Sequence, residues 1–257
     1  MTDDQTHKSR LTIDHEGLGI PAGAYALPTL GAVEHLGEDT HSRFAAHFAG
    51  ELPLSALTDA ETAFLREHFF DQFADRRQRA LEYFGRNVPL RFRDAAPEEP
   101  ATAWAKEVAA DPHTARSVLL LGPTGTGKTH WAYGALRAVA SAGAWVPWTA
   151  VTEADLYSRL RPRPGHDQEA EFQKIARTPL LFLDDLGAAK PSEWAEEVIY
   201  RLVNHRYDHC LPSLFASNLA PKGLADTLGA RVASRLTQMC DRIAIKGEDR
   251  RLTKGQA

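Results

Sequence analysis

The sequence predicts an α/β fold in which a five-stranded parallel sheet lies between helices. Apolar runs of strand length recur from residue 117 onwards, and helical stretches separate them. Strands that are apolar along their whole length are typical of a parallel sheet covered on both faces. The strand candidates are Ser117–Leu121, Trp145–Val151, Leu180–Leu183, Ser213–Ser217 and Arg242–Ile245.

Two of the intervening helices carry clear boundary signals. A helix over Lys128–Ala142 is closed by Gly143, a residue that commonly ends helices. A longer helix over Glu193–Asp208 follows Pro191 and Ser192, which suit the two positions before a helix. These signals support alternation of strands and helices along the second half of the chain.

Length and composition are those of an ordinary globular protein. The 257 residues, 43% of them hydrophobic, suffice for one large domain with a smaller appendage. The two cysteines, Cys210 and Cys240, exclude a disulfide framework and a cysteine-rich zinc module, and we expect both to be buried. Because the chain has no long apolar stretch and starts with polar, acidic residues, we expect a cytoplasmic protein without membrane contact.

Charge is distributed unevenly along the chain. The net charge is −4, and residues 1–60 contain three basic and nine acidic residues. The other 197 residues contain 27 basic and 25 acidic ones, so the chain lacks the overall basic character of many nucleic-acid-binding proteins. Any contact with DNA or RNA therefore has to come from a local patch, which oligomerisation could enlarge.

The region before the strand–helix alternation divides into two parts. Residues 1–54 show no sustained hydrophobic period, which predicts a loosely structured arm with short strands or helices at most. Thr58 and Glu61 form a capping-box pattern at the start of a helix over residues 58–85. The apolar residues of this helix share one face and are Leu65, Phe69, Phe73, Leu81 and Phe84.

That apolar face has two interpretations: the helix packs on its own domain, or it docks on a partner protein. We therefore divide the chain into an N-terminal appendage, residues 1–86, and a second domain, residues 87–257.

A glycine-rich loop directly follows the first predicted strand. Its residues are Gly122, Pro123, Thr124, Gly125, Thr126, Gly127, Lys128 and Thr129. Successive backbone N–H groups at a helix N-terminus bind phosphate oxygens, and glycines let the backbone approach closely. In this pattern Lys128 reaches the β- and γ-phosphates of ATP and Thr129 is a ligand of Mg²⁺. The loop predicts ATP·Mg²⁺ binding.

Polar residues follow two further strands. Asp184 and Asp185 end the apolar run from Leu180, and in a phosphate-binding protein such carboxylates serve a bound Mg²⁺. We assign Asp184 to the metal and Asp185 to orienting or deprotonating the attacking water. Asn218 follows Ser213–Ser217, at the strand end where ligands bind in open α/β sheets. Its amide could contact the γ-phosphate or the water, or it could only turn the chain.

Arg231 and Arg235 are four residues apart and share one helix face. Two guanidinium groups on one face suit phosphate recognition, although a solvated face is the common outcome for such a pair.

In this order, the motifs resemble the AAA+ ATPases of the DnaC/IstB-like group, which includes replicative helicase loaders and ATP-binding helpers of transposases. The resemblance covers about residues 87–250. Its matching segments are Gly122–Thr129, Leu180–Gly187, Ser217–Leu219, Arg231–Leu236 and the entry segment Val88–Asp94.

The resemblance implies roles for several of these residues. Asp184 and Asp185 would be the Walker B pair, with Asp185 where many AAA+ proteins have Glu. Asn218 would be sensor 1. Arg231 would be an arginine finger acting on the neighbouring subunit's ATP, supported by Arg235, which implies an ATP-dependent homo-oligomer. Because little chain follows the last predicted strand, we expect no C-terminal helical lid, which agrees with this group.

The resemblance further implies contacts with nucleic acid. The helix starting near Thr152, with Arg159, Arg161 and Arg163, lies where the group binds single-stranded DNA; the alternative is a solvated basic turn. We therefore expect a replicative helicase loader that assembles on single-stranded DNA and delivers a ring helicase. The alternative is a transposition helper ATPase that binds duplex DNA and recruits a transposase, and a small-molecule kinase is a third, less supported alternative.

Overall fold

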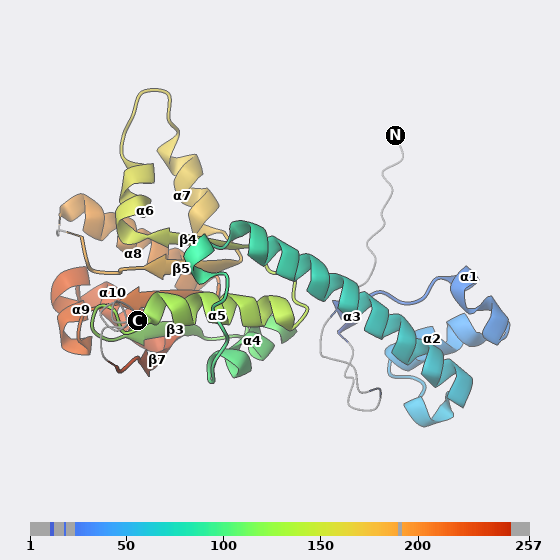
Figure 1. Cartoon of the computed structure of the whole chain (residues 1–257). Coiled ribbons are helices and arrows are strands. Elements are labelled where there is room, and N and C mark those ends of the chain that lie inside the picture. The colour runs from blue at the N-terminus through green and yellow to red at the C-terminus, as the bar shows by residue number, and fades with distance from the viewer. Residues whose placement is uncertain (1–10, 13–17, 19–23, 190–191, 248–257) are drawn as a thin grey trace.

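The computed structural model describes residues 11–12, 18, 24–189 and 192–247. A sheet domain and a smaller N-terminal lobe are joined by one long helix, α3 (Asp59–Asn87) (Figure 1). The N-terminal lobe consists of residues 24–57 and the first half of α3. The molecule is therefore elongated, with α3 as the rod between its two parts.

The central sheet has five parallel strands in the order β4-β5-β6-β3-β7, which confirms the predicted fold class. The strands are β3 (Ser117–Leu121), β4 (Trp148–Thr152), β5 (Leu180–Asp184), β6 (Ser213–Ser217) and β7 (Cys240–Ala244). The predicted boundaries agree within three residues. The neighbouring strands β5, β6 and β3 place their carboxyl ends at one edge of the sheet, where polar residues follow them.

Side chains of each strand alternate between two apolar cores. Val118 and Leu120 face a core formed with α4 (Ala101–Ala110), α5 (Lys128–Ser141) and the second half of α3. Leu119 and Leu121 face the second core. That core is completed by α6 (Glu153–Leu160), α7 (Gln168–Ala176), α8 (Glu193–Asp208), α9 (Pro221–Leu228) and α10 (Ala230–Met239). Burial on both faces explains why the three interior strands, β3, β5 and β6, are largely apolar.

Helix α3 begins with the predicted capping box. The Thr58 hydroxyl accepts the Glu61 N–H at 3.2 Å, and the Glu61 carboxylate accepts the Thr58 N–H at 2.7 Å. Leu65 and Phe69 are buried in the core of the N-terminal lobe. About three to four turns later, Ala80 and Phe84 belong to the core beneath α4 and α5. A single helix thus contributes both to the core of the N-terminal lobe and to one core of the sheet domain.

Residues 30–57 are more regularly folded than their sequence suggests. They form α1 (Leu30–Val33) and α2 (Thr40–Phe48), with 3₁₀ turns at Glu34–Leu36 and Leu54–Ala56. The short helices agree with the expectation, but the stretch is not loose, because these helices bury Val33 and Phe44 against α3. A third 3₁₀ turn, η3 (Leu90–Phe92), follows α3, and β1 (Leu11–Thr12) pairs antiparallel with β2 (Ala24–Tyr25).

The α8 cap, the two cysteines and the segment after β7 were also predicted from the sequence. Ser192 caps α8 by accepting the Ala195 N–H, whereas Pro191 lies outside the described residues. Cys240 is buried, but Cys210 is exposed because it lies in the turn between α8 and β6. Within residues 24–189 and 192–247 no helix follows β7. The predicted absence of a lid also concerns residues 248–257, which the structure does not describe. No described helix is long and apolar enough to cross a membrane.

Candidate functional site

The glycine-rich loop connects β3 to α5 at the carboxyl edge of the sheet. Gly127, the residue before α5, has a φ of 102°, a backbone conformation that residues other than glycine adopt only with strain. A Cβ atom on Gly122 would lie 2.2 Å from the carbonyl oxygen of Ile245, just beyond β7. Glycine at these positions is thus required by the backbone path and by close packing. The loop ends at the N-terminus of α5, where free N–H groups favour an anion.

Lys128 is held inside this loop. Its ammonium group donates to the carbonyl oxygens of Gly122 at 2.7 Å and Pro123 at 2.8 Å, and to Oδ1 of Asn218 at 2.6 Å. The residue is only 6% exposed. Asn218 follows β6, so two motifs separated by 90 residues meet at one cation.

Thr129 and Asp184 meet on the other side of the loop. The Thr129 hydroxyl donates to Oδ2 of Asp184 at 2.8 Å, while the other carboxylate oxygen accepts the Asp185 N–H at 2.9 Å. Burial raises the pKa of Asp184 above its ordinary value and the charge of Asp185 adds to this effect, although the Thr129 hydrogen bond and Lys128 oppose it. A cation beside Asp184 would stabilise the charged carboxylate and lower its pKa.

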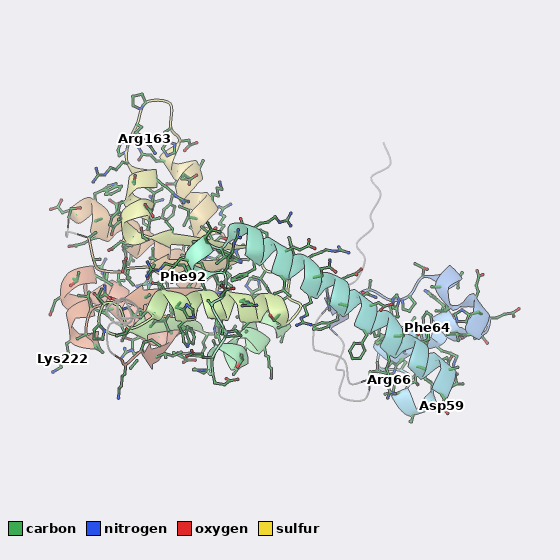
Figure 2. All side chains as sticks on the ribbon, viewed as in Figure 1. Asp59, Phe64, Arg66, Phe92, Arg163 and Lys222 are labelled. Carbon is green, nitrogen blue, oxygen red and sulfur yellow. The ribbon has the colours of Figure 1, made fainter. Side chains whose placement is uncertain are left out.

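A pocket of about 590 Å³ opens over the loop. It is lined by Arg91, Phe92, Asp94, Thr124, Gly125, Gly127, Lys128, Thr129, His130, Asp185 and Asn218. The Phe92 ring, labelled in Figure 2, stacks on Tyr133 of α5 with 4.8 Å between ring centroids. The segment Arg91–Asp94 thus forms one wall of the pocket, a role that the sequence analysis did not assign to these residues. The same holds for His130.

The donor set fits a nucleoside triphosphate with Mg²⁺. Backbone N–H groups and the Lys128 ammonium supply positive charge for phosphate oxygens. The Thr129 hydroxyl and Asp184 carboxylate are hard oxygen ligands, the kind that Mg²⁺ prefers. When bound there, Mg²⁺ would neutralise charge on the β- and γ-phosphates. Asp185 and Asn218, both exposed at the pocket, are within the same site.

The two arginines of α10 are not brought into this pocket. Neither Arg231 nor Arg235 belongs to its lining residues. Arg231 is exposed on the first turn of α10. The Arg235 guanidinium instead lies over two rings of α8, 5.3 Å from the centroid of Tyr200 and 5.7 Å from that of Tyr207.

Basic residues occupy the projection formed by α6, α7 and the loop between them, which we call the α6–α7 projection. Arg159 lies in the last turn of α6, and Arg161 and Arg163 lie in the loop; all three are exposed. Figure 2 shows Arg163 near the tip of the projection, remote from Phe92 at the pocket wall.

Two buried charged residues were not identified from sequence. Glu153, the first residue of α6, accepts the N–H groups of Gly187 and Ala189, just after the Asp184-Asp185 pair. Arg206 of α8 is fully buried and donates to the Ser213 hydroxyl and to carbonyl oxygens of Thr178 and Pro212, just before β5 and β6. Burial lowers the pKa of Arg206 to about 9. The partners of both are mainly backbone groups, for which the sequence carries no signal.

The family model described as IstB-like ATP binding protein matches residues 109–257, more than half of the chain and the whole of the region from β3 to β7. The chain belongs to the IstB-like ATP-binding protein family.

Relatives of this IstB-like protein include a helicase loader and an insertion-sequence protein. The replicative helicase loader DnaI of Bacillus subtilis is 31% identical over 96 residues, which cover 32% of this chain and 31% of DnaI. The IS21 insertion-sequence ATP-binding protein of Pseudomonas aeruginosa is 28% identical over 144 residues, or 53% of this chain and 52% of that protein. The chain thus spans about 31% and 52% of the length of these two curated relatives.

Solved structures share the fold. The crystal structure of the DnaC helicase loader aligns with a TM-score of 0.52 and 24% identity, covering 62% of this chain and 100% of that chain. The crystal structure of DnaI aligns with a TM-score of 0.53 and 23% identity, covering 64% of this chain and 94% of that chain. The IstB-like protein therefore has a P-loop AAA+-like α/β fold.

Proposed function

We propose that this IstB-like protein hydrolyses ATP and acts in the cytoplasm as a replicative helicase loader, coupling ATP-dependent assembly on single-stranded DNA to helicase delivery. The observation that carries the proposal is the convergence of Lys128, Asn218, Thr129 and Asp184 through contacts of 2.6–2.8 Å at one edge of the sheet. The helicase-loader part is further supported by the likeness to DnaI.

Each side chain has a distinct role in the proposed reaction. Lys128 and the N–H groups of the loop bind the phosphates, while Thr129 and Asp184 hold Mg²⁺. Asp185 accepts a proton from the attacking water, since it lines the pocket and is exposed there. Asn218 orients the γ-phosphate or that water and, through its contact with Lys128, keeps the ammonium group in place.

The arginines of α10 support an oligomer. Because Arg231 is exposed and does not line its own chain's pocket, we propose that it reaches the ATP of a neighbouring subunit as an arginine finger. Arg235 supports it by packing over the Tyr200 and Tyr207 rings, which fixes α10 against α8. The proposed assembly is an ATP-dependent homo-oligomer.

The partner and the nucleic acid are proposed to use opposite parts of the molecule. The exposed Arg159, Arg161 and Arg163 of the α6–α7 projection would contact the phosphates of single-stranded DNA. The appendage, residues 1–86, would dock on a hexameric replicative helicase through the N-terminal lobe, which α3 holds away from the sheet domain.

A transposition helper ATPase is the second candidate. The IS21 protein matches 53% of this chain, more than the 32% that DnaI matches. Such a helper would bind duplex DNA and recruit a transposase with the same catalytic residues.

One experiment separates the candidates. The ATPase rate of the full chain is measured without DNA, with single-stranded DNA and with duplex, while light scattering follows oligomer size. Stimulation and assembly on single strands support the loader, and co-purification with a hexameric helicase then tests the partner. Preferential response to duplex supports the transposition helper. Indifference to both forms of DNA contradicts both and favours a small-molecule kinase.

A further inference from the structure

Glu153 is a buried carboxylate that binds a loop far from it in sequence. It is the first residue of α6 and is 2% exposed. Its Oε2 accepts the N–H groups of Gly187 and Ala189, each at 3.0 Å. Its Oε1 accepts the hydroxyl of Tyr157, one turn along α6, at 2.9 Å. Burying a carboxylate is unfavourable unless such donors are supplied, so the arrangement is specific.

The loop that Glu153 binds carries the proposed catalytic carboxylate. Asp185 has a φ of 54°, an uncommon conformation for a residue with a side chain, so its neighbours have to hold it. On the sheet side, the Leu186 N–H donates to Ala216 at 2.8 Å and the Leu186 carbonyl accepts the Ser217 hydroxyl at 2.6 Å.

Glu153 holds the same loop from helix α6, outside the sheet. The contacts of Leu186 come from β6, within the sheet, whereas those of Gly187 and Ala189 come from a helix. Glu153 also directly follows Thr152, which pairs with Asp184 across β4 and β5. The loop after β5 is thereby fixed to both the sheet and the first turn of α6.

We propose that Glu153 is a positioning residue for ATP hydrolysis: its carboxylate fixes residues 185–189 so that Asp185 faces the pocket. This inference rests on the proposed ATPase function. It also connects the site to the α6–α7 projection, because the helix that begins at Glu153 ends beside Arg159 after only eight residues. A nucleic acid that shifts α6 would move the loop of Asp185 with it.

The proposal predicts an effect on turnover and not on nucleotide binding. Glu153 does not line the pocket, whereas Lys128 and the glycine-rich loop do. Displacing a catalytic group by about 1 Å can reduce a rate by roughly 100-fold. A group that acts only on the hydrolytic step changes kcat and leaves the affinity for ATP unchanged.

The test compares Glu153→Ala, Glu153→Gln and Tyr157→Phe in the full chain. Three quantities are measured: kcat, the Kd of a non-hydrolysable ATP analogue, and hydrogen exchange of the peptide containing residues 184–189. Glu153→Ala should lower kcat by about 10- to 100-fold, keep Kd within about threefold and accelerate exchange in this peptide. Glu153→Gln should retain most of kcat because the amide oxygen can accept both N–H groups.

Tyr157→Phe is the matched control. It removes the third hydrogen bond of the same carboxylate but leaves the contacts with Gly187 and Ala189, so it should behave as the wild type in all three measurements. Should Glu153→Ala fail to fold, Glu153→Asp takes its place. It withdraws the carboxylate by one methylene and should lower kcat about tenfold with Kd unchanged.

Specific outcomes overturn the proposal. Wild-type kcat and wild-type exchange in Glu153→Ala or Glu153→Asp would do so, as would a loss of kcat in Glu153→Gln equal to that in Glu153→Ala. A wild-type chain that never hydrolyses ATP contradicts the proposed function instead. In that case the exchange rate of residues 184–189 still decides whether Glu153 holds the loop.

Discussion

The ammonium group of Lys128 lies 2.6 Å from the amide oxygen of Asn218. Lys128 begins α5 after the glycine-rich loop, and Asn218 follows β6, the strand beside β3. This contact joins the phosphate-binding loop to the neighbouring strand end. Because a hydrogen bond to a charged group is stronger than one between neutral groups, removing either partner should disturb the other.

Replacing Asn218 by Ala should lower ATP turnover more than ATP binding. The loop N–H groups and Lys128 remain, but Lys128 loses an acceptor worth about 1.5–3 kcal/mol, as hydrogen bonds to charged groups are. We expect kcat to fall by roughly 10- to 100-fold, which corresponds to that free energy. Steady-state kinetics and calorimetric ATP binding measure the two effects. Asn204→Ala on α8 is the control, since the Asn204 side chain donates to Asp208 and does not line the pocket.

Asp185→Asn should bind ATP and hydrolyse it poorly. The amide cannot accept a proton from water, and general base catalysis contributes about 10²–10⁴ in rate. Phosphate release and ATP binding should be measured on the same preparation. Asp226→Asn on α9, an exposed residue outside the pocket, should have no effect. Unchanged hydrolysis in Asp185→Asn would show that Asp185 is not the base.

Arg231→Ala should bind ATP yet lose most hydrolysis, because arginine fingers contribute about 10³–10⁵ in rate in related systems. Mixing it with Asp185→Asn should restore activity at some subunit interfaces, where an intact Arg231 meets an intact Asp185. Lys222→Ala, at an exposed position of α9 labelled in Figure 2, is the control for surface charge. Absence of recovery on mixing would argue against action across subunits.

The sheet was predictable because its strands are apolar on both faces. Val118 and Leu119 point into different cores, so each strand of the sheet interior stands out as a continuous apolar run. The edge strands were less well located. Strand β7 starts at Cys240, two residues before its predicted start, because the exposed Asp241 interrupts the apolar pattern. Strand β4 starts after Pro147, which cannot donate a backbone hydrogen bond.

The site was predictable only where a motif repeats a known chemical arrangement. The glycine-rich loop, Asp184 and Asn218 stand at strand ends, so the parallel sheet brings them together. Glu153 and the pocket wall at Phe92 were not found. Glu153 binds backbone N–H groups 34 and 36 residues away, and Phe92 depends on stacking with Tyr133. Such partners are set by tertiary packing, which leaves no local pattern.

Glu61→Gln should destabilise the N-terminal lobe at neutral pH but not in acid. Burial would raise the pKa of Glu61, yet hydrogen bonds from Arg43 and Thr58 outweigh it and hold the pKa below its ordinary 4.5. The charge therefore stabilises the fold above about pH 4.5, and this stabilisation is lost as pH falls through the lower folded-state pKa. Hydrogen exchange of α2 and the start of α3 at pH 7 and below pH 4 measures the difference. A destabilisation that persists in acid would contradict this assignment.

Whether this protein hydrolyses ATP at the glycine-rich loop is measured most directly by Mg²⁺-dependent phosphate release from ATP, compared between the full chain and Lys128→Ala. We predict turnover by the wild type only when Mg²⁺ is present, and loss of both ATP binding and turnover in the variant, because Lys128 is the buried cation of the phosphate loop. Turnover that survives in Lys128→Ala, or a wild-type chain that binds ATP but releases no phosphate with or without DNA, would contradict it.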